Sequence, residues 1–166
     1  MELNEFFDYK NLLMKELCSS ANIVSLITDR DNPDIPNRSL AYSQIYPYEF
    51  IPETIDDAQT FICFDVDVAE VINKTFYSPV LYVWVFTHKS KMHLSSGGIR
   101  IDKLASELDK ILNGSRYYGL GELDLRSVGR FSPITDYQGR VLTYYTRDFN
   151  RRISKQPPSN RKASSN

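Results

Sequence analysis

Two aspartates come closest to a catalytic arrangement in this sequence. Asp65 and Asp67 are separated by one residue within a β-type segment, so their carboxylates should lie on the same face of a strand. Paired carboxylates of this kind can bind a divalent metal ion, and nucleases use strand aspartates in that way. Such a site also needs a third acid and usually a lysine at fixed spacing, which no run of the chain clearly supplies. We interpret both residues as solvated surface acids, and a metal-dependent nuclease remains the alternative.

The remaining polar residues form no recognisable reactive group. His88 and His93 are the only histidines, and their spacing of five in a predicted loop does not match the i, i+4 pairing of a helical metal site. The glycines at 97–98 and 119–121 do not extend into a phosphate-binding motif. No serine or cysteine has the flanking sequence of a catalytic nucleophile. We therefore expect no catalytic, cofactor-binding or metal-ligating residue, no cofactor, and a protein that is not an enzyme.

The two cysteines and the N-terminal sequence predict an intracellular setting. Cys18 falls in a predicted helix and Cys63 in a predicted strand, which favours buried reduced thiols over a disulfide. The chain begins without a basic region followed by an apolar run, so we expect no signal peptide. No apolar run approaches the length of a membrane span, and we expect no membrane partner.

Charge is divided unevenly along the chain. Residues 151–166 contain five basic and no acidic residues, which gives +5. Residues 1–150 contain 15 basic and 21 acidic residues, which gives −6. An acidic body is a poor general DNA binder, so any nucleic-acid contact should come from the basic segment.

The elements that would position these residues predict an α+β domain. Apolar residues at helical spacing predict helices over 3–18, with a further turn or two at 21–27, and over 99–112. Alternating or continuous apolar runs predict four strands, over 60–68, 80–88, 122–131 and 141–149. The order α-β-β-α-β-β predicts helices packed on one face of a small antiparallel or mixed sheet. We expect one domain over residues 1–150, followed by a basic flexible tail over residues 151–166.

Four segments in the second half of the chain carry a resemblance to a known family. They are IRIDKLA at 99–105, GLGELDL at 119–125, FSP at 131–133 and YQGRVLTY at 137–144. These segments resemble tail-terminator and tail-completion proteins of tailed bacteriophages, which are small ring-forming parts of the neck. The element order agrees over roughly residues 3–149, and residues 80–88 resemble the central strand of that family.

The resemblance implies a structural virion protein without a cofactor or an active site. Its subunits would form a ring, a hexamer or alternatively a dodecamer, between the tail tube and the head connector on the portal side. DNA would pass through the channel without sequence-specific binding. The protein would be found in the virion neck after assembly in the host cytoplasm. A head-completion adaptor or another neck protein is the closest alternative, and an intracellular adaptor domain that binds by strand addition is a third hypothesis.

An aromatic arm and the basic segment are the candidates for subunit contacts. Two prolines interrupt residues 40–52, which predicts an edge strand or an extended arm lying on a neighbour. Aromatic and arginine side chains are enriched where proteins meet. The interface candidates are Tyr46, Tyr48, Phe50, Arg151, Arg152 and Lys155.

Overall fold

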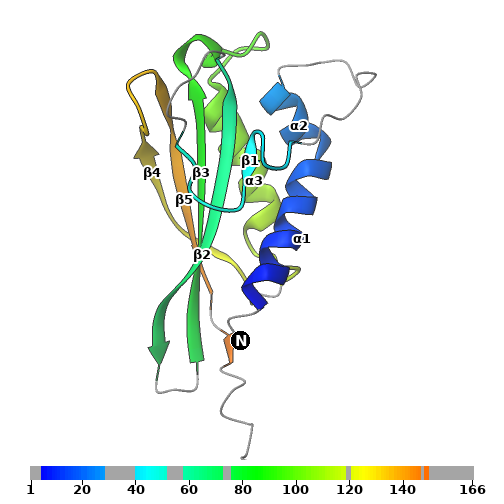
Figure 1. The fold of residues 1–166 in the computed structure, drawn as a ribbon, viewed down its shortest axis with the longest axis vertical. Helices are drawn as coiled ribbons and strands as arrows, with labels where there is room; N and C mark the ends of the chain where they lie inside the picture. Colours follow the sequence, from blue (N-terminus) through cyan, green and yellow to red (C-terminus); the bar gives the residue numbers. More distant parts are fainter. Residues whose placement is uncertain are drawn as a thin grey trace, which may run out of the picture.

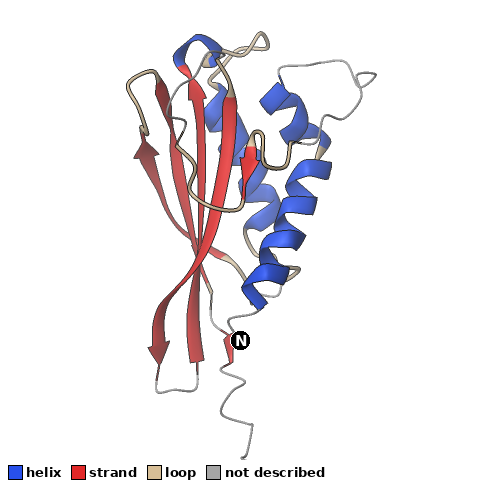
Figure 2. Cartoon of the chain, viewed as in Figure 1, coloured by secondary structure: helices blue, strands red, loops and turns tan. Residues whose placement is uncertain are grey.

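Helices cover one face of a mixed β-sheet, which confirms the predicted α+β class (Figures 1 and 2). The computed structural model describes residues 5–28, 40–51, 58–72, 76–118, 121–146 and 148–149. Within these residues the helices are α1 (Glu5–Ser19), α2 (Ala21–Thr28) and α3 (Arg100–Leu112), with a 3-10 turn, η1, at Lys89–Lys91. The strands are β1 (Ile45–Tyr46), β2 (Thr60–Ile72), β3 (Phe76–His88), β4 (Asp124–Phe131), β5 (Tyr137–Tyr145) and β6 (Asp148–Phe149).

The sheet is built around one long hairpin. Its strand order is β1-β2-β3-β5-β4, and β6 pairs with the beginning of β3. The short edge strand β1 runs parallel to β2, and the other neighbours are antiparallel. The strand β3 therefore lies in the centre of the sheet, as its continuous apolar sequence predicts.

The main core lies between the helices and the sheet. Helical spacing brings one stripe of α1 and one stripe of α3 against the sheet. The side chains of these stripes are buried at Tyr9, Leu13 and Leu17, and at Leu104, Leu108 and Leu112. The spacing of apolar residues over 3–18 also predicts Phe7 on the buried side of this helix. That prediction is wrong, because Phe7 is 72% exposed. At about 100° per residue it lies some 200° around α1 from Tyr9.

Two strands begin earlier than the sequence predicts. Residues 76–79 precede the strand predicted over 80–88 but belong to β3, and residues 137–140 precede the strand predicted over 141–149 but belong to β5. Pairing explains both differences, because Phe76 lies opposite Ile72 of β2 and Tyr137 lies opposite His88 of β3. The ladder thus includes polar residues and a glycine that have weak strand propensity on their own.

Two further predicted segments lie outside the residues that the structure describes. The predicted basic tail, residues 151–166, lies outside them. Residues 29–36, where two prolines predict a loop, lie outside them as well. Among the described residues, none of the helices combines the length and the apolar character that crossing a membrane requires.

Candidate interaction surface

The face of the sheet opposite the helices, which we call the outer face, carries a lattice of aromatic side chains. Strand pairing aligns its residues in four rows, each running from β2 through β3 and β5 to β4. The rows are Phe61–Phe86–Gly139–Phe131, Cys63–Trp84–Val141–Gly129, Asp65–Tyr82–Thr143–Ser127 and Asp67–Val80–Tyr145–Asp124. The first two rows are mainly apolar, and acids appear only in the last two.

The half of the outer face next to η1 is closed by the chain itself. Tyr46 is buried there, and its ring stacks on Phe50 with centroids 4.1 Å apart. Phe50 in turn packs against Phe61. Residues 40–51 of the predicted aromatic arm therefore fold back on their own sheet, with β1 as a two-residue edge strand. Of its three interface candidates, only Tyr48 is largely exposed, at 45%.

Gly139 lets this aromatic cluster close. A Cβ atom at position 139 would lie 2.0 Å from the carbonyl oxygen of Val85 and 2.7 Å from the Cβ of Phe86. Only a hydrogen atom fits at this point. The rings of Phe86 and Phe131 can then meet across the row, with centroids 5.6 Å apart.

The other half of the outer face stays open, and we call it the aromatic–acidic patch. Its members are Tyr82, Trp84, Tyr145, Asp65, Asp67 and Asp124. Tyr82 stacks on Trp84 with ring centroids 5.8 Å apart, and both side chains are half-buried. Tyr145 is 40% exposed. This half therefore presents aromatic surface together with carboxylates from β2 and from β4.

The three acids of the patch differ in their partners. Asp65 forms an ion pair with Lys10 of α1, at 2.6 Å, and also accepts a hydrogen bond from the backbone N–H of Val66. Asp124 pairs with Arg126 at 3.0 Å. Asp67 is exposed and has no ion-pair partner among the described residues.

The predicted common face of Asp65 and Asp67 is confirmed by the register, which places them opposite Tyr82 and Val80. Asp67 is exposed to solvent, as the sequence predicts for both acids. Asp65 is instead half-buried and forms an ion pair with Lys10. Within the part of the chain that the structure describes, no three His, Cys, Asp or Glu side chains gather as a metal ion would require.

The histidines and cysteines lie at separate places in the fold. The Nδ1 atom of His88 accepts a hydrogen bond from the N–H of Ser90 and caps η1, while His93 is exposed. Both cysteines are unpaired, as expected. Cys63 is buried under the outer-face cluster, and this burial raises its pKa to about 12, whereas Cys18 is only half-buried.

A second open region lies along β4, at one edge of the sheet. The helix α3 packs on β3 and β5, so β4 extends beyond it and Val128 is 50% exposed on the helix side. Between the start of α3 and the β4–β5 hairpin lies a groove of about 510 Å³. Its lining includes Ile99, Arg130 and Arg140, and Arg140 donates to Asp102 at 2.9 Å. This region could not be predicted from the sequence, because its exposure depends on where α3 lies.

Two buried charged residues of α3 connect elements of the helical layer. Arg100 donates to the backbone carbonyl groups of Lys91 and Leu26. Glu107 accepts hydrogen bonds from Lys110 and from Asn22 of α2. These hydrogen bonds lower the pKa of Glu107 to about 2. Both residues contribute to the arrangement of the helices rather than to an open site.

Comparison with known proteins gives one positive result. A family model described as YomW matches residues 20–146, which include α2, α3 and the strands from β1 to β5. No significant match was found among curated proteins or among solved structures. The family match points to a phage-associated protein.

Proposed function

We propose that this chain, which belongs to the YomW family, is a structural protein of the phage neck, a ring-forming tail-terminator or tail-completion subunit that joins the tail to the head. In this role it has no catalytic activity and needs no cofactor. Its partners are further copies of itself, the tail-tube protein and the connector on the head side. It acts in the assembled virion.

This proposal rests on the difference between the two ends of the strand order, which we call the two sides of the subunit. One side ends in β4, whose outer edge pairs with no strand in the described part of the chain, next to the exposed Val128 and the adjoining groove. The opposite side is formed by β1 and β2 together with α1, which packs on them (Figure 1). On α1, Phe7 is exposed. Unlike surfaces on opposite sides suit head-to-tail contacts, and such contacts form a closed ring when the rotation between subunits closes.

The free edge of β4 also offers a means of association. An edge strand presents unpaired backbone N–H and C=O groups, which readily pair with another chain. Side chains on β4 are mostly exposed, including Arg126 and Arg130. Strand addition, which the sequence suggested for an adaptor domain, thereby becomes a contact between ring subunits in this proposal.

Self-association tests the proposal. Native mass spectrometry of the protein, alone and with the tail-tube protein, should show an assembly at six or twelve times the 19.2-kDa subunit mass. Val128→Glu should reduce the assembly because it places a charge at the β4 edge, and its circular dichroism should be unchanged because the site is exposed. Ser106→Glu, at an exposed site on α3, is the control and should assemble normally. A protein that stays monomeric under both conditions would contradict the proposal.

A further inference from the structure

The groove between the start of α3 and the β4–β5 hairpin has the size and the lining of a binding site. Its volume of about 510 Å³ falls within the usual range of ligand sites in proteins. Its apolar lining is formed by Met92 and Ile99, from the segment that leads into α3, and by Ile101 of the first turn of this helix. The hairpin contributes Arg130 of β4 and Arg140 of β5. The groove therefore combines apolar surface with positive charge.

Strand pairing places the two arginines side by side. Arg130 and Arg140 lie directly opposite each other in the β4–β5 register, so their side chains project from the same face of the sheet. Two residues along, Val128 and Leu142 form the next pair on that face, and Leu142 is buried in the main core under the helices. Both arginines therefore project on the helix side of the sheet, where the groove lies.

The charges of the two arginines are unequally balanced. Asp102 of α3 accepts hydrogen bonds from Nε and Nη2 of Arg140, at 2.9 Å from each nitrogen. Arg130 is exposed, and none of the described acidic side chains pairs with it. Like charges directly opposite each other on neighbouring strands destabilise a sheet. The groove, whose described lining holds two arginines and one acid, therefore has a place for a further anion at Arg130.

A carboxylate on a protein segment fits this lining better than a free anion or a nucleic acid. The planar guanidinium group of arginine binds a carboxylate through two parallel hydrogen bonds. An inorganic anion would pair with Arg130 but would leave the apolar lining, where Ile99 is 43% exposed, without a partner. A DNA backbone would bring several phosphates toward residues 1–150, whose net charge is −6. An acidic residue beside an apolar one uses both parts of the groove.

We propose that the groove binds an acidic segment of a partner protein, in which a glutamate or aspartate carboxylate pairs with Arg130 and an adjoining apolar side chain packs on Ile99. The bound carboxylate then balances Arg130 as Asp102 balances Arg140. The contact does not depend on the proposed function, because the groove of a single subunit is sufficient for it.

Two matched peptides test this inference. One is the acetylated and amidated peptide Gly-Ser-Leu-Glu-Leu-Ser-Gly, and the other has glutamine in place of the glutamate. Titration of the isotope-labelled full-length protein, followed by NMR, should give saturable shifts within residues 99–102 and 130–140. The glutamate peptide should bind about five- to tenfold more tightly than the glutamine peptide, because a bidentate pair of charge-assisted hydrogen bonds distinguishes them.

Arg130→Gln should remove the difference between the two peptides. The control Arg126→Gln, which changes another exposed arginine of β4 that pairs with Asp124, should retain it. Circular dichroism should be unchanged in both variants, because both side chains are exposed.

Equal affinity of the two peptides for the wild type, or no saturable binding at millimolar peptide, would overturn the proposal. Loss of the difference in Arg126→Gln as well would do the same, because general surface charge would then explain it. Inorganic phosphate or a DNA oligonucleotide that displaces the glutamate peptide at an equal concentration would also overturn it, because the groove would then accept any anion. Shifts of the same residues that appear without peptide as the protein concentration rises would assign the groove to a second copy of the chain instead.

Discussion

At the scale of single residues, Gly139 shows how closely the outer face is packed. The space for its missing side chain is occupied by the backbone of β3, as the 2.0 Å approach to the Val85 carbonyl oxygen demonstrates. Strand propensity disfavours glycine, and the strand predicted over 141–149 accordingly begins after this residue. Packing of two neighbouring strands explains why it lies inside one.

Gly139→Ala should destabilise the protein by about 3 kcal/mol, because the new methyl group can be accommodated only by moving the backbone. Gly129→Ala is a matched control in the same hairpin. Its Cβ would meet only the Cγ1 atom of the Val141 side chain, at 3.1 Å, and that side chain can move. Urea denaturation should therefore show a much smaller loss for Gly129→Ala, and equal losses would contradict the packing described here.

The pair Asp65 and Asp67 gives a second prediction at this scale. Asp65→Ala should cost about 1 kcal/mol, because it removes the ion pair with Lys10 and the hydrogen bond to the Val66 N–H. Asp67→Ala should change the free energy of unfolding by less than about 0.5 kcal/mol. Denaturation of both single variants tests this difference. Incubation of the wild type with DNA and Mg²⁺ or Mn²⁺ should give no cleavage, and cleavage that disappears in Asp67→Ala would support the nuclease alternative.

Sequence alone grouped these two aspartates on one face but could not distinguish them. Their shared face follows from the two-residue period of a strand. Their difference arises from Lys10, which lies 55 positions away in the chain and reaches Asp65 only through the packing of α1. The same limit explains why Tyr46 and Tyr48 were predicted alike, although one is buried and the other is exposed.

At the scale of elements, long periodic segments were predictable and their ends were less so. The helix expected over 99–112 is α3 (Arg100–Leu112), and its expected apolar stripe is the buried one. The helical spacing of the apolar residues predicts both the extent of this helix and its buried face. The starts of β3 and β5 were wrong because pairing partners distant in sequence extend these strands.

The contact between α2 and α3 predicts a dependence on pH. Glu107 has its usual pKa in the unfolded chain and a pKa of about 2 in the folded protein, because Lys110 and Asn22 donate to its carboxylate. The unfolded chain therefore binds more protons as the pH falls below about 4.5. The stabilisation is present above that pH and is lost progressively as the pH approaches about 2.

Glu107→Gln should lower stability at neutral pH and flatten its dependence on pH between about 4.5 and 2. Urea denaturation across this range measures the effect. Glu122→Gln, which removes an exposed carboxylate paired with Arg116, is the control and should keep the wild-type slope. An unchanged slope in Glu107→Gln would show that this carboxylate does not link the two helices.

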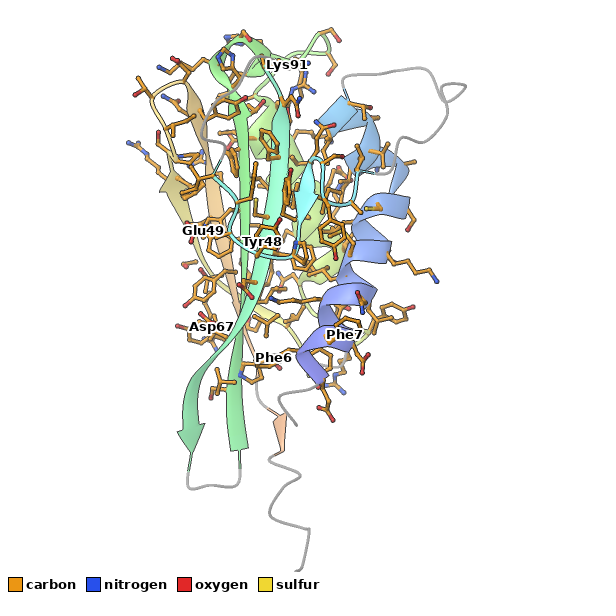
Figure 3. All side chains as sticks on the ribbon, in the orientation of Figure 1. Phe6, Phe7, Tyr48, Glu49, Asp67 and Lys91 are labelled. Carbon is orange, nitrogen blue, oxygen red and sulfur yellow. The ribbon has the colours of Figure 1, made fainter. Side chains whose placement is uncertain are left out.

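At the scale of the whole molecule, the two sides of the sheet differ in shape and chemistry. One face is covered by the helices, and the other, the outer face, carries Asp67; Phe7 of α1 and Asp67 of β2 accordingly lie on opposite sides in the view of Figure 3. No local sequence motif encodes such an asymmetry, since it arises from strand order and from which strands the helices cover. The resemblance of residues 99–149 to neck proteins supplied the functional hypothesis, and the YomW match supports its phage-associated part.

The position of the protein in the phage particle tests the central claim most directly. Gold-labelled antibodies against the protein, imaged on intact particles and on separated tails, should mark a single site at the head–tail junction. Separated tails should keep the label at one end if the protein terminates the tail, and heads should keep it if the protein is a head-completion adaptor. Labelling along the whole tube, or particles without label, would contradict a role in the neck.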